Sequence, residues 1–308
     1  MEKKSAFVAV VGRPSVGKSS LVNLFCGQKV AIVSAVPQTT RNAIRGIVNR
    51  PQGQLVFVDT PGRHASERKL NKKLMEVADR AVAESELVLY LLDASRPPGA
   101  EEEAIVTGLA SFALTTLVVA VNKMDAKGAD FEAARSFITQ RLPLLPEARI
   151  FGISALKDEG TGPLLDCLFS LAVEGEPLYP EEYYTDQDLG FRIAEIIREK
   201  AINRLRQELP HSLYVEVADT ELRSKEGAPE GDPEKTRLWV RAFIITERES
   251  QKGMVVGKGG EMIKAIRQAA QKELNSILDW KVELDLRVKS SHDWRHNDKV
   301  LKRLISRE

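Results

Sequence analysis

Residues 7–19 read FVAVVGRPSVGKS, an apolar run followed by a glycine-rich loop that ends in Gly-Lys-Ser. The loop at 12–19 fits the pattern Gly-x-x-x-x-Gly-Lys-Ser, and the following residues continue with helical spacing. Because Gly12 and Gly17 permit close backbone approach, successive N–H groups can point at phosphate oxygens. We therefore expect a strand, a phosphate-binding loop and a helix whose N-terminus adds its positive dipole end.

The side chains of this loop predict separate roles around a bound nucleotide. Lys18 is expected to bridge the β- and γ-phosphates, and the Ser19 hydroxyl is expected to ligate Mg²⁺. The predicted cradle comprises Gly12, Arg13, Pro14, Ser15, Val16, Gly17, Lys18, Ser19 and Ser20. The loop alone does not separate ATP from GTP.

Alternating elements extend this pattern over residues 7–173. Near-continuous apolar runs, typical of strands buried on both faces of a parallel sheet, occur at 7–11, 54–59, 87–93, 116–122 and 149–154. Helical patterns between them occur at 70–83, 101–111 and 131–141. The alternation predicts an α/β domain, with a mostly parallel sheet and helices on both faces.

The segment NKMD (122–125) follows the fourth apolar run and indicates which base is bound. Guanine presents donors at N1 and at its exocyclic amine, and the Asp125 carboxylate could accept both. Asn122 would then bond the pocket and the ring N7, while the Lys123 stem, followed by Met124, covers the base face. Adenine would leave the buried carboxylate unpaired, a loss on the order of 10³-fold in affinity.

Three further segments complete the predicted nucleotide site. SAL (Ser154, Ala155, Leu156) could offer the Ala155 N–H to guanine O6, and DTPG comprises Asp59, Thr60, Pro61 and Gly62. Asp59 is expected to hold Mg²⁺ through a water, and the Gly62 N–H to reach the γ-phosphate. In PQTTR (37–41), Thr40 is the expected metal ligand and Thr39 the alternative. The predicted metal ligands are therefore Ser19, Thr40 and Asp59, and the candidate catalytic groups are Lys18, Thr40 and Gly62. All follow strand ends that would share one sheet edge.

The composition changes after residue 173. The stretch EGEPLYPEEYYTD has two prolines, five acidic residues and no basic residue, so we expect a linker over 174–187 between a domain at 1–173 and another at 188–308. The second domain reads as helix, strand, strand, helix, Gly-x-x-Gly, helix, strand and a final basic helix. From Gln251 to Glu308 there are 13 Lys and Arg against 8 Asp and Glu, a local charge of +5 in a chain of net charge +1. This asymmetry favours an anionic partner.

The loop GKGG (257–260) lies between two expected helices. A Gly-x-x-Gly loop in this position lets backbone amides approach phosphates, and such loops hold about four nucleotides of single-stranded RNA in K-homology (KH) domains. The candidate RNA contacts are Gly257, Lys258, Gly259, Gly260, Lys264 and Arg267. Lys264 and Arg267 could instead form a solvated helix face. Met262, Ile263, Ile266 and Ala270 fall at helical spacing and are expected to pack in a core.

With GRPSVGKS, QTTR, DTPG, NKMD and SA in this order, the chain resembles the Era family of translation-factor-related GTPases over essentially its full length. The order of elements after 188 and KVELDLRVKSSHDW (281–294) fit the same family, in which the C-terminal domain is a type II KH domain. The resemblance implies GTP/GDP and Mg²⁺ as ligands. It implies an RNA-binding switch in small ribosomal subunit maturation that binds the 3′ region of the 16S-type rRNA. It also implies a cytoplasmic monomer, with peripheral membrane association left open.

The sequence departs from the family pattern at two places. Arg63 follows DTPG where Era relatives carry an apolar residue and Ras-like proteins a water-orienting Gln, so Arg63 or His64 are open alternatives for charge stabilisation or water positioning. Ser15 stands where potassium-using relatives have Asn, so K⁺ activation is in doubt. We expect slow intrinsic hydrolysis that a partner accelerates.

Several interpretations remain open at this stage. The C-terminal part could bind a protein or an anionic lipid in a signalling or membrane-associated GTPase, and an ATP-dependent kinase is disfavoured by NKMD. Trp294 is expected to pack in the core or between domains, with base stacking as the alternative. Cys26 and Cys167 are expected to be small buried residues of a reducing compartment. The N-terminus has no cleavage pattern and predicts a mature start without a signal peptide.

Overall fold

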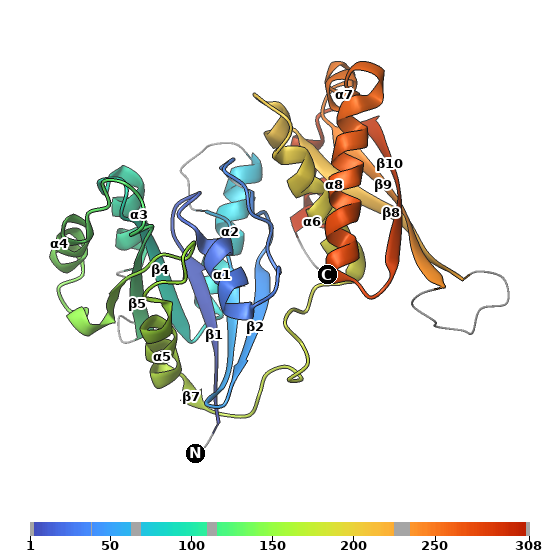
Figure 1. The fold of residues 1–308 in the computed structure, drawn as a ribbon. Helices are drawn as coiled ribbons and strands as arrows, with labels where there is room; N and C mark the ends of the chain where they lie inside the picture. The colour runs from blue at the N-terminus through green and yellow to red at the C-terminus, as the bar shows by residue number, and fades with distance from the viewer. Residues whose placement is uncertain (1–2, 38, 63–68, 110–115, 225–234, 306–308) are drawn as a thin grey trace. The chain divides into compact units, whose positions relative to one another are not determined.

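The structure of this chain is a computed structural model that describes residues 3–37, 39–62, 69–109, 116–224 and 235–305. The chain divides into two compact units, and the main division falls between Asp186 and Gln187. Figure 1 shows that each unit is a sheet with helices packed against it. Among the described residues, no helix is both long enough and apolar enough to cross a lipid bilayer.

The first unit is built on a sheet with the strand order β2-β3-β1-β4-β5-β6. Neighbouring strands are parallel, except that β2 runs antiparallel to β3, and β7 pairs antiparallel with the start of β1. The strands are β1 (Lys4–Val11), β2 (Ile44–Arg50), β3 (Gly53–Asp59), β4 (Leu87–Asp93), β5 (Leu117–Asn122), β6 (Ile150–Gly152) and β7 (Val173–Glu174). The predicted mostly parallel sheet is confirmed.

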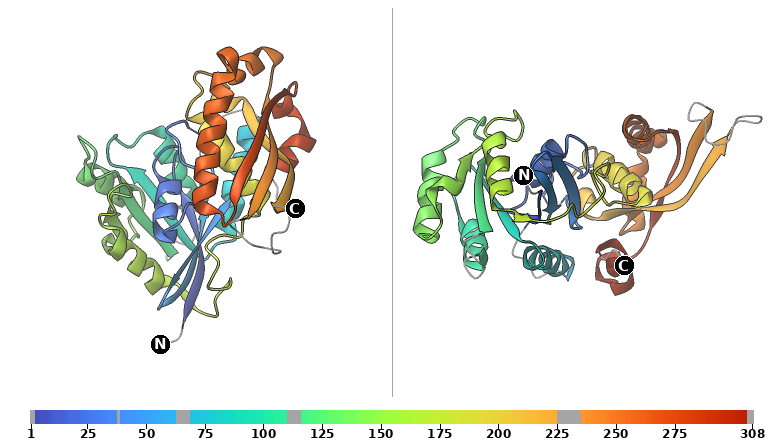
Figure 2. Two further views of the ribbon diagram at one scale, coloured as in Figure 1. Left: turned by 45° about the vertical axis from the view of Figure 1, so that its right-hand side comes forward. Right: turned by 90° about the horizontal axis from the view of Figure 1, so that it is seen from below.

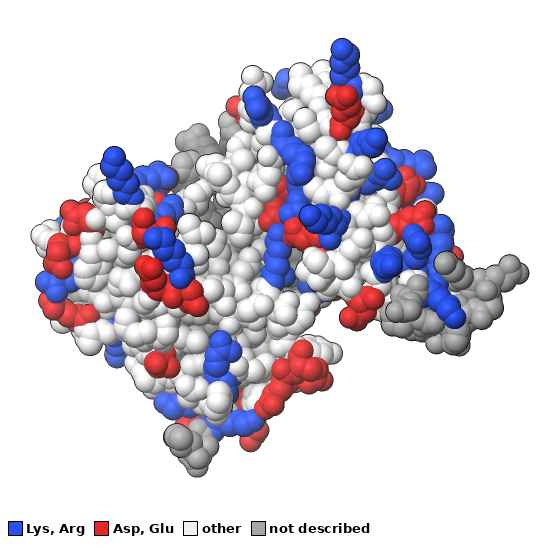
Figure 3. Space-filling view, in the orientation of Figure 1, with Lys and Arg blue, Asp and Glu red and all other residues white. Residues whose placement is uncertain are grey.

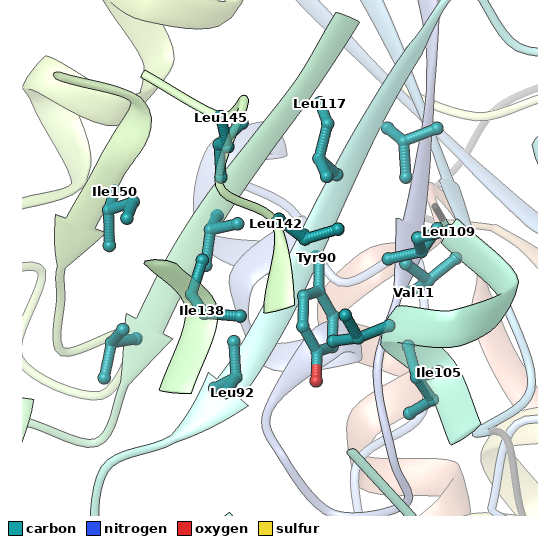
Figure 4. Close-up of a cluster of buried hydrophobic side chains, with 14 of the residues drawn as sticks. Val11, Tyr90, Leu92, Ile105, Leu109, Leu117, Ile138, Leu142, Leu145 and Ile150 are labelled. Carbon is teal, nitrogen blue, oxygen red and sulfur yellow. The ribbon is translucent and has the colours of Figure 1, made fainter. Parts of the chain in front are cut away.

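Helices cover both faces of this sheet, as the views in Figure 2 show. They are α1 (Lys18–Cys26), α2 (Lys69–Ala83), α3 (Ala100–Leu109), α4 (Phe131–Arg141) and α5 (Thr161–Leu171). Side chains of α2, α3 and α4 share one core with alternate residues of the central strands. Tyr90 of β4, Ile105 of α3 and Ile138 of α4 belong to this core (Figure 4). The intervening residues of β4 are buried on the other face. Burial on both faces explains the continuous apolar runs.

The second unit has a three-stranded sheet in the order β10-β9-β8, with β9 antiparallel to β8 and parallel to β10. Its elements are α6 (Leu189–Ile202), β8 (Leu213–Ser224), β9 (Thr236–Thr246), α7 (Glu249–Val256), α8 (Glu261–Ile277), β10 (Lys281–Ser290) and α9 (Asp298–Ile305). Apolar residues of α6, α7 and α8 form one core with the sheet. Ile266 and Ala270 are fully buried there, with Met262 and Ile263 packed against them, as their spacing predicts.

Trp294 belongs to the interior of the second unit. Its ring is fully buried, lies edge-on to Tyr214 with 4.9 Å between centroids, and donates from Nε1 to the Ser212 carbonyl at 3.1 Å. A ring enclosed in this way has no free face for a base. The packing interpretation of Trp294 is therefore confirmed, and the stacking interpretation is wrong.

The acidic stretch after residue 173 is bound to the first unit along most of its length. Gln54, which is buried, exchanges two hydrogen bonds of 2.8 Å with the backbone of Tyr179. The Ile47 N–H of β2 donates to the Tyr184 carbonyl at 2.9 Å. The segment predicted as a linker thus begins inside β7, to which it contributes Glu174, and then follows the edge strand β2.

The cysteines differ from the expectation in degree. Cys26 and Cys167 are free and only half-buried. Burial nevertheless raises the pKa of the Cys26 thiol to about 12, with the Arg50 charge opposing the rise. Both thiols lie outside the site described next.

Candidate functional site

The carboxyl ends of the parallel strands bring the predicted segments together at one edge of the sheet. Asp59 ends β3, Gly12 follows β1, Asp93 ends β4 and Asn122 ends β5. Since β3, β1, β4 and β5 are consecutive neighbours, these residues lie in that order along the edge, and Asp93 pairs with Asn122 in register. The chain continues from β1 to β2 and β3 on one side of the sheet, and β4 to β6 lie on the other side of β1. Open α/β sheets bind ligands where the strand order switches in this way.

The phosphate loop leads from β1 into α1 and holds the Lys18 ammonium at its centre. Lys18 Nζ donates to the carbonyls of Gly12 at 3.0 Å and Arg13 at 2.9 Å. Burial lowers the pKa of Lys18 to about 8, and the Asp59 carboxylate partly opposes this shift. Gly17 caps α1 at a φ of 104°, and a Cβ there would lie 2.3 Å from Asn122 Nδ2, so a side chain does not fit.

Three oxygen atoms from separate segments meet beside this loop. The Ser19 hydroxyl donates to Asp59 Oδ2 at 2.6 Å and lies 3.1 Å from Thr40 Oγ1, which donates to the same carboxylate oxygen at 3.4 Å. Asp59 Oδ1 is buried, with no hydrogen-bond partner among the described residues. Burial raises the pKa of Asp59, and Lys18, Ser19 and Thr40 oppose the rise. A buried carboxylate oxygen without a partner, beside two hydroxyls, is a donor set that fits Mg²⁺.

Asn122 joins the phosphate loop to the SAL segment. Its Nδ2 donates to the Val16 carbonyl at 2.8 Å, and its Oδ1 accepts from the Ala155 N–H at 2.9 Å. The Ala155 N–H was expected to face guanine O6, whereas here it is donated to Asn122. Since Asn122 is buried, both bonds are shielded from water.

The remaining predicted pocket residues differ in what their side chains do. Asp125 accepts from the Ser154 hydroxyl at 2.6 Å, which orients the carboxylate. Met124 is half-buried against the core, while the Leu156 side chain is 85% exposed. The Thr60 hydroxyl turns inward to the Val10 carbonyl at 2.7 Å, so any contact of Thr60 with a nucleotide would come from its backbone.

Other residues of the cradle lie around the loop. Pro14, Ser20 and Gly62 are half-buried, and Gly62 lies against Pro14. Ser15 is exposed at a left-handed φ of 61°. Thr39 and Pro61 are buried. Arg63 and His64 lie outside the described residues, so their predicted roles stay predictions.

Asp93 and Glu102 are site residues that the sequence analysis did not single out. Asp93 lies 2.7 Å from Lys123 Nζ and 3.3 Å from the Arg13 guanidinium, which also contacts Glu102 at 2.9 Å. Burial tends to raise the pKa of Asp93, but bonds from Lys123 and Ser95 outweigh it and lower the pKa. The signal for Asp93 was present, because it ends an apolar strand at the same edge as Asp59 and Asn122.

In the second unit, the GKGG loop forms a tight turn between α7 and α8. Gly257, Gly259 and Gly260 adopt φ values of 75°, 60° and 81°. A Cβ at Gly257 would meet Met262, whereas a Cβ at Gly259 or Gly260 would meet nothing within 4 Å. The outer part of the turn is therefore open to a ligand.

The predicted basic contacts of this unit are all at the surface. Lys258, Lys264 and Arg267 are exposed, on the loop and the first turns of α8. Figure 3 shows Lys and Arg side chains on the surface of this unit with acidic side chains among them. The exposure of Lys264 and Arg267 fits both their predicted role as RNA contacts and a solvated helix face.

Comparisons with known proteins extend over both units. The profile of the family described as 50S ribosome-binding GTPase matches residues 7–123, and that of the KH domain matches 208–295. GTPase Era of Treponema denticola is 50% identical over 97% of this chain and 99% of its own length. GTPase Era of Borreliella burgdorferi is 42% identical over 98% of this chain and 100% of its own length.

Two solved structures match along the whole chain. A crystal structure of Era in complex with MgGDPNP and nucleotides 1506–1542 of 16S ribosomal RNA has a TM-score of 0.89 at 33% identity, covering 99% of each chain. Era of Aquifex aeolicus bound to GDP·AlF4⁻ has a TM-score of 0.88 at 33% identity, covering 98% of this chain and 99% of that one. The fold and the strand-end site define a P-loop GTPase joined to a KH domain. Within that class, the chain belongs to the Era family.

Proposed function

We propose that this protein is a GTP-hydrolysing switch that binds the 3′ region of small-subunit ribosomal RNA during maturation of that subunit. One observation carries the nucleotide part: Lys18, the oxygen cluster of Ser19, Thr40 and Asp59, and Asn122 lie at one sheet edge. An Era structure that holds both MgGDPNP and a 16S rRNA fragment supports the RNA part. We place the protein in the cytoplasm as a monomer, on the ground of its family.

The electrostatics of the phosphate loop favour an anionic ligand and a cation together. Burial disfavours the charged forms of Lys18 and Asp59, so it lowers the pKa of Lys18 and raises the pKa of Asp59. A polyphosphate beside Lys18 would favour the ammonium, and a divalent cation would favour the carboxylate. The charged forms of Lys18 and Asp59 would therefore both be stabilised when nucleotide and metal bind together.

Ser19, Thr40 and Asp59 are the residues that would hold Mg²⁺. When bound, the ion neutralises charge on the phosphate oxygens. Lys18 and the loop amides would supply the same stabilisation from the protein, and the Gly62 N–H would contact the γ-phosphate. We expect slow hydrolysis by the isolated chain, because positioning of the water rests on residues beyond these. Fast single-turnover hydrolysis by the isolated chain would contradict that expectation.

Asp125 would select guanine, since its carboxylate can accept both guanine donors and is already oriented by Ser154. Asp125→Asn should move the preference from GTP to xanthosine triphosphate, measured by competition against a fluorescent guanine nucleotide. Asp130→Asn is the matched control, because Asp130 only caps α4 and Asn caps equally well. Tight ATP binding by the unmodified protein would contradict the guanine assignment.

The GKGG loop would hold single-stranded RNA. Gly259→Asp is a clean perturbation, because a Cβ there meets no atom within 4 Å and Asp tolerates positive φ. Together with Lys258→Asp it should abolish binding of a 3′-end rRNA oligonucleotide and leave GTP binding intact. Lys272→Asp, an exposed change farther along α8, is the matched control. Loss of binding to anionic vesicles, without any RNA affinity in the parent protein, would favour the membrane-associated alternative.

A path for nucleotide control leads from Thr40 to the end of the linker. β2 begins four residues after Thr40, and its Arg45 pairs with Asp186 at 2.7 Å, directly before the second unit. A change in Thr40 on GTP binding could therefore alter the linker through β2. RNA affinity should differ about tenfold between GTP analogue and GDP. Equal affinity with GTP analogue, GDP and no nucleotide would refute this coupling.

A further inference from the structure

We propose that Asp93 is a positioning residue for guanine-nucleotide binding, because its one buried carboxylate pairs with both Lys123 of the base-binding motif and Arg13 of the phosphate loop. The inference rests on the proposed function, since it takes Lys123 as the residue that covers the guanine base. It assigns to the end of β4 a role that the nucleotide motifs themselves do not contain.

On the base side, Asp93 fixes the tip of Lys123. The Lys123 ammonium lies 2.7 Å from Asp93 Oδ2, where the Asp93 side chain is 1% exposed and that of Lys123 33%. Lys123 also has a φ of 67°, a left-handed conformation that costs energy for a residue with a long side chain. The ion pair therefore holds the end of a side chain whose backbone is already constrained, which orients the stem over the base.

On the phosphate side, the same carboxylate is a counter-ion of Arg13. The Arg13 guanidinium is buried, 3.3 Å from Asp93 and 2.9 Å from Glu102, and the Arg13 carbonyl accepts from Lys18 Nζ. Glu102 is itself held by the Gly99 N–H at 3.0 Å. Removing the Asp93 charge would leave a buried guanidinium with one counter-ion in place of two.

Asp93 and Glu102 differ in which of the two cations they contact. Glu102 contacts Arg13 and has no described contact with Lys123, whereas Asp93 contacts both. If Asp93 acts on the base through Lys123, its effect on nucleotide release should shrink once the Lys123 charge is gone, and only the part that passes through Arg13 should remain. The effect of Glu102, which passes only through the phosphate loop, should persist.

The experiment is a double-mutant cycle in the full-length protein, with the dissociation rate of N-methylanthraniloyl-GDP as readout. Lys123→Met keeps the stem that covers the base and removes only the ammonium. We expect Asp93→Asn and Lys123→Met each to speed dissociation about tenfold, and the double variant to fall well short of the roughly hundredfold increase that independent effects would give. Glu102→Gln combined with Lys123→Met should instead multiply the two single effects.

Multiplied effects of Asp93→Asn and Lys123→Met would overturn the inference. The inference would also be overturned if the effects of Glu102→Gln and Lys123→Met did not multiply. The faster dissociation of the Asp93 variants would then reflect a general disturbance of the buried ion pairs. Asp93→Glu keeps the charge, should fall between the parent and Asp93→Asn, and replaces Asp93→Asn in the cycle if the latter does not fold. A parent protein that binds no GDP would contradict the proposed function itself, whereas multiplied effects in a GDP-binding protein contradict only the role of Asp93.

Discussion

Replacing Asn122 with alanine should destabilise the first unit even when no nucleotide is present. The side chain makes two buried bonds, to the Val16 carbonyl and from the Ala155 N–H. Each is worth about 1 kcal/mol net, and leaving both partners buried and unpaired raises the cost to about 1–3 kcal/mol each. We therefore expect Asn122→Ala to lower the free energy of unfolding by about 2–6 kcal/mol.

The tryptophan distribution supplies an internal control for this measurement. All three tryptophans, Trp239, Trp280 and Trp294, lie in the second unit. Urea unfolding followed by circular dichroism reports on both units, whereas tryptophan fluorescence reports on the second alone. Asn122→Ala should shift the former transition and leave the latter in place.

A matched variant separates general destabilisation from damage to the site. Asp130→Ala removes the N-cap bond to the Ala133 N–H of α4 and should cost about 1 kcal/mol. Added GDP should stabilise Asp130→Ala as much as the parent, and Asn122→Ala far less. The reasoning is refuted if nucleotide-free Asn122→Ala unfolds within about 1 kcal/mol of the parent, or if both transitions shift equally.

Four further outcomes are expected. Asp59→Asn should bind GTP with the same reduced affinity in Mg²⁺ and in EDTA, because the carboxylate of the oxygen cluster is lost; a retained Mg²⁺ effect would contradict this. Trp294→Leu should lower the stability of the second unit by about 3 kcal/mol, seen in urea unfolding through the two remaining tryptophans. Gln54→Ala should release the 174–187 stretch and speed its limited proteolysis, with unchanged cleavage counting against the contact with Tyr179. Cys26 should react slowly with iodoacetamide at pH 8, because burial raises its pKa to about 12 and keeps the thiol protonated, and quickly once the chain is unfolded in urea.

The sequence was most informative where apolar runs end in polar residues. The runs at 87–93 and 116–122 predicted β4 and β5 to within a residue, because a strand buried on both faces needs apolar side chains at every position. Since parallel strands place their carboxyl ends together, the meeting of Asp59, Asn122 and the phosphate loop followed from their order alone. The Thr40 hydroxyl lies in the oxygen cluster beside Ser19, and its role as a metal ligand stays a prediction.

Other features depend on distant partners that a linear pattern does not contain. β2 is an edge strand with a partly polar sequence, IRGIVNR, and lacks the continuous apolar run that marked its neighbours. The acidic stretch looked like a free connection, because its bonds to Gln54 and β2 are made largely by backbone groups. Asp93 was passed over because no motif surrounds it, although its strand-end position was visible. The Ala155 N–H was assigned to a ligand because its contact with Asn122 appears only in three dimensions.

The parallel pairing of β9 with β10 bears on how the second unit is synthesised and folded. β8 and β9 can form a local hairpin as soon as both have left the ribosome, but the other side of β9 stays unpaired until α7, α8 and β10 have followed. During that interval the emerging chain exposes a long apolar strand edge, the kind of surface on which nascent chains aggregate. A message truncated before residue 281 would make this condition permanent, so loss of a short C-terminal piece should cost the whole unit and not merely its last strand.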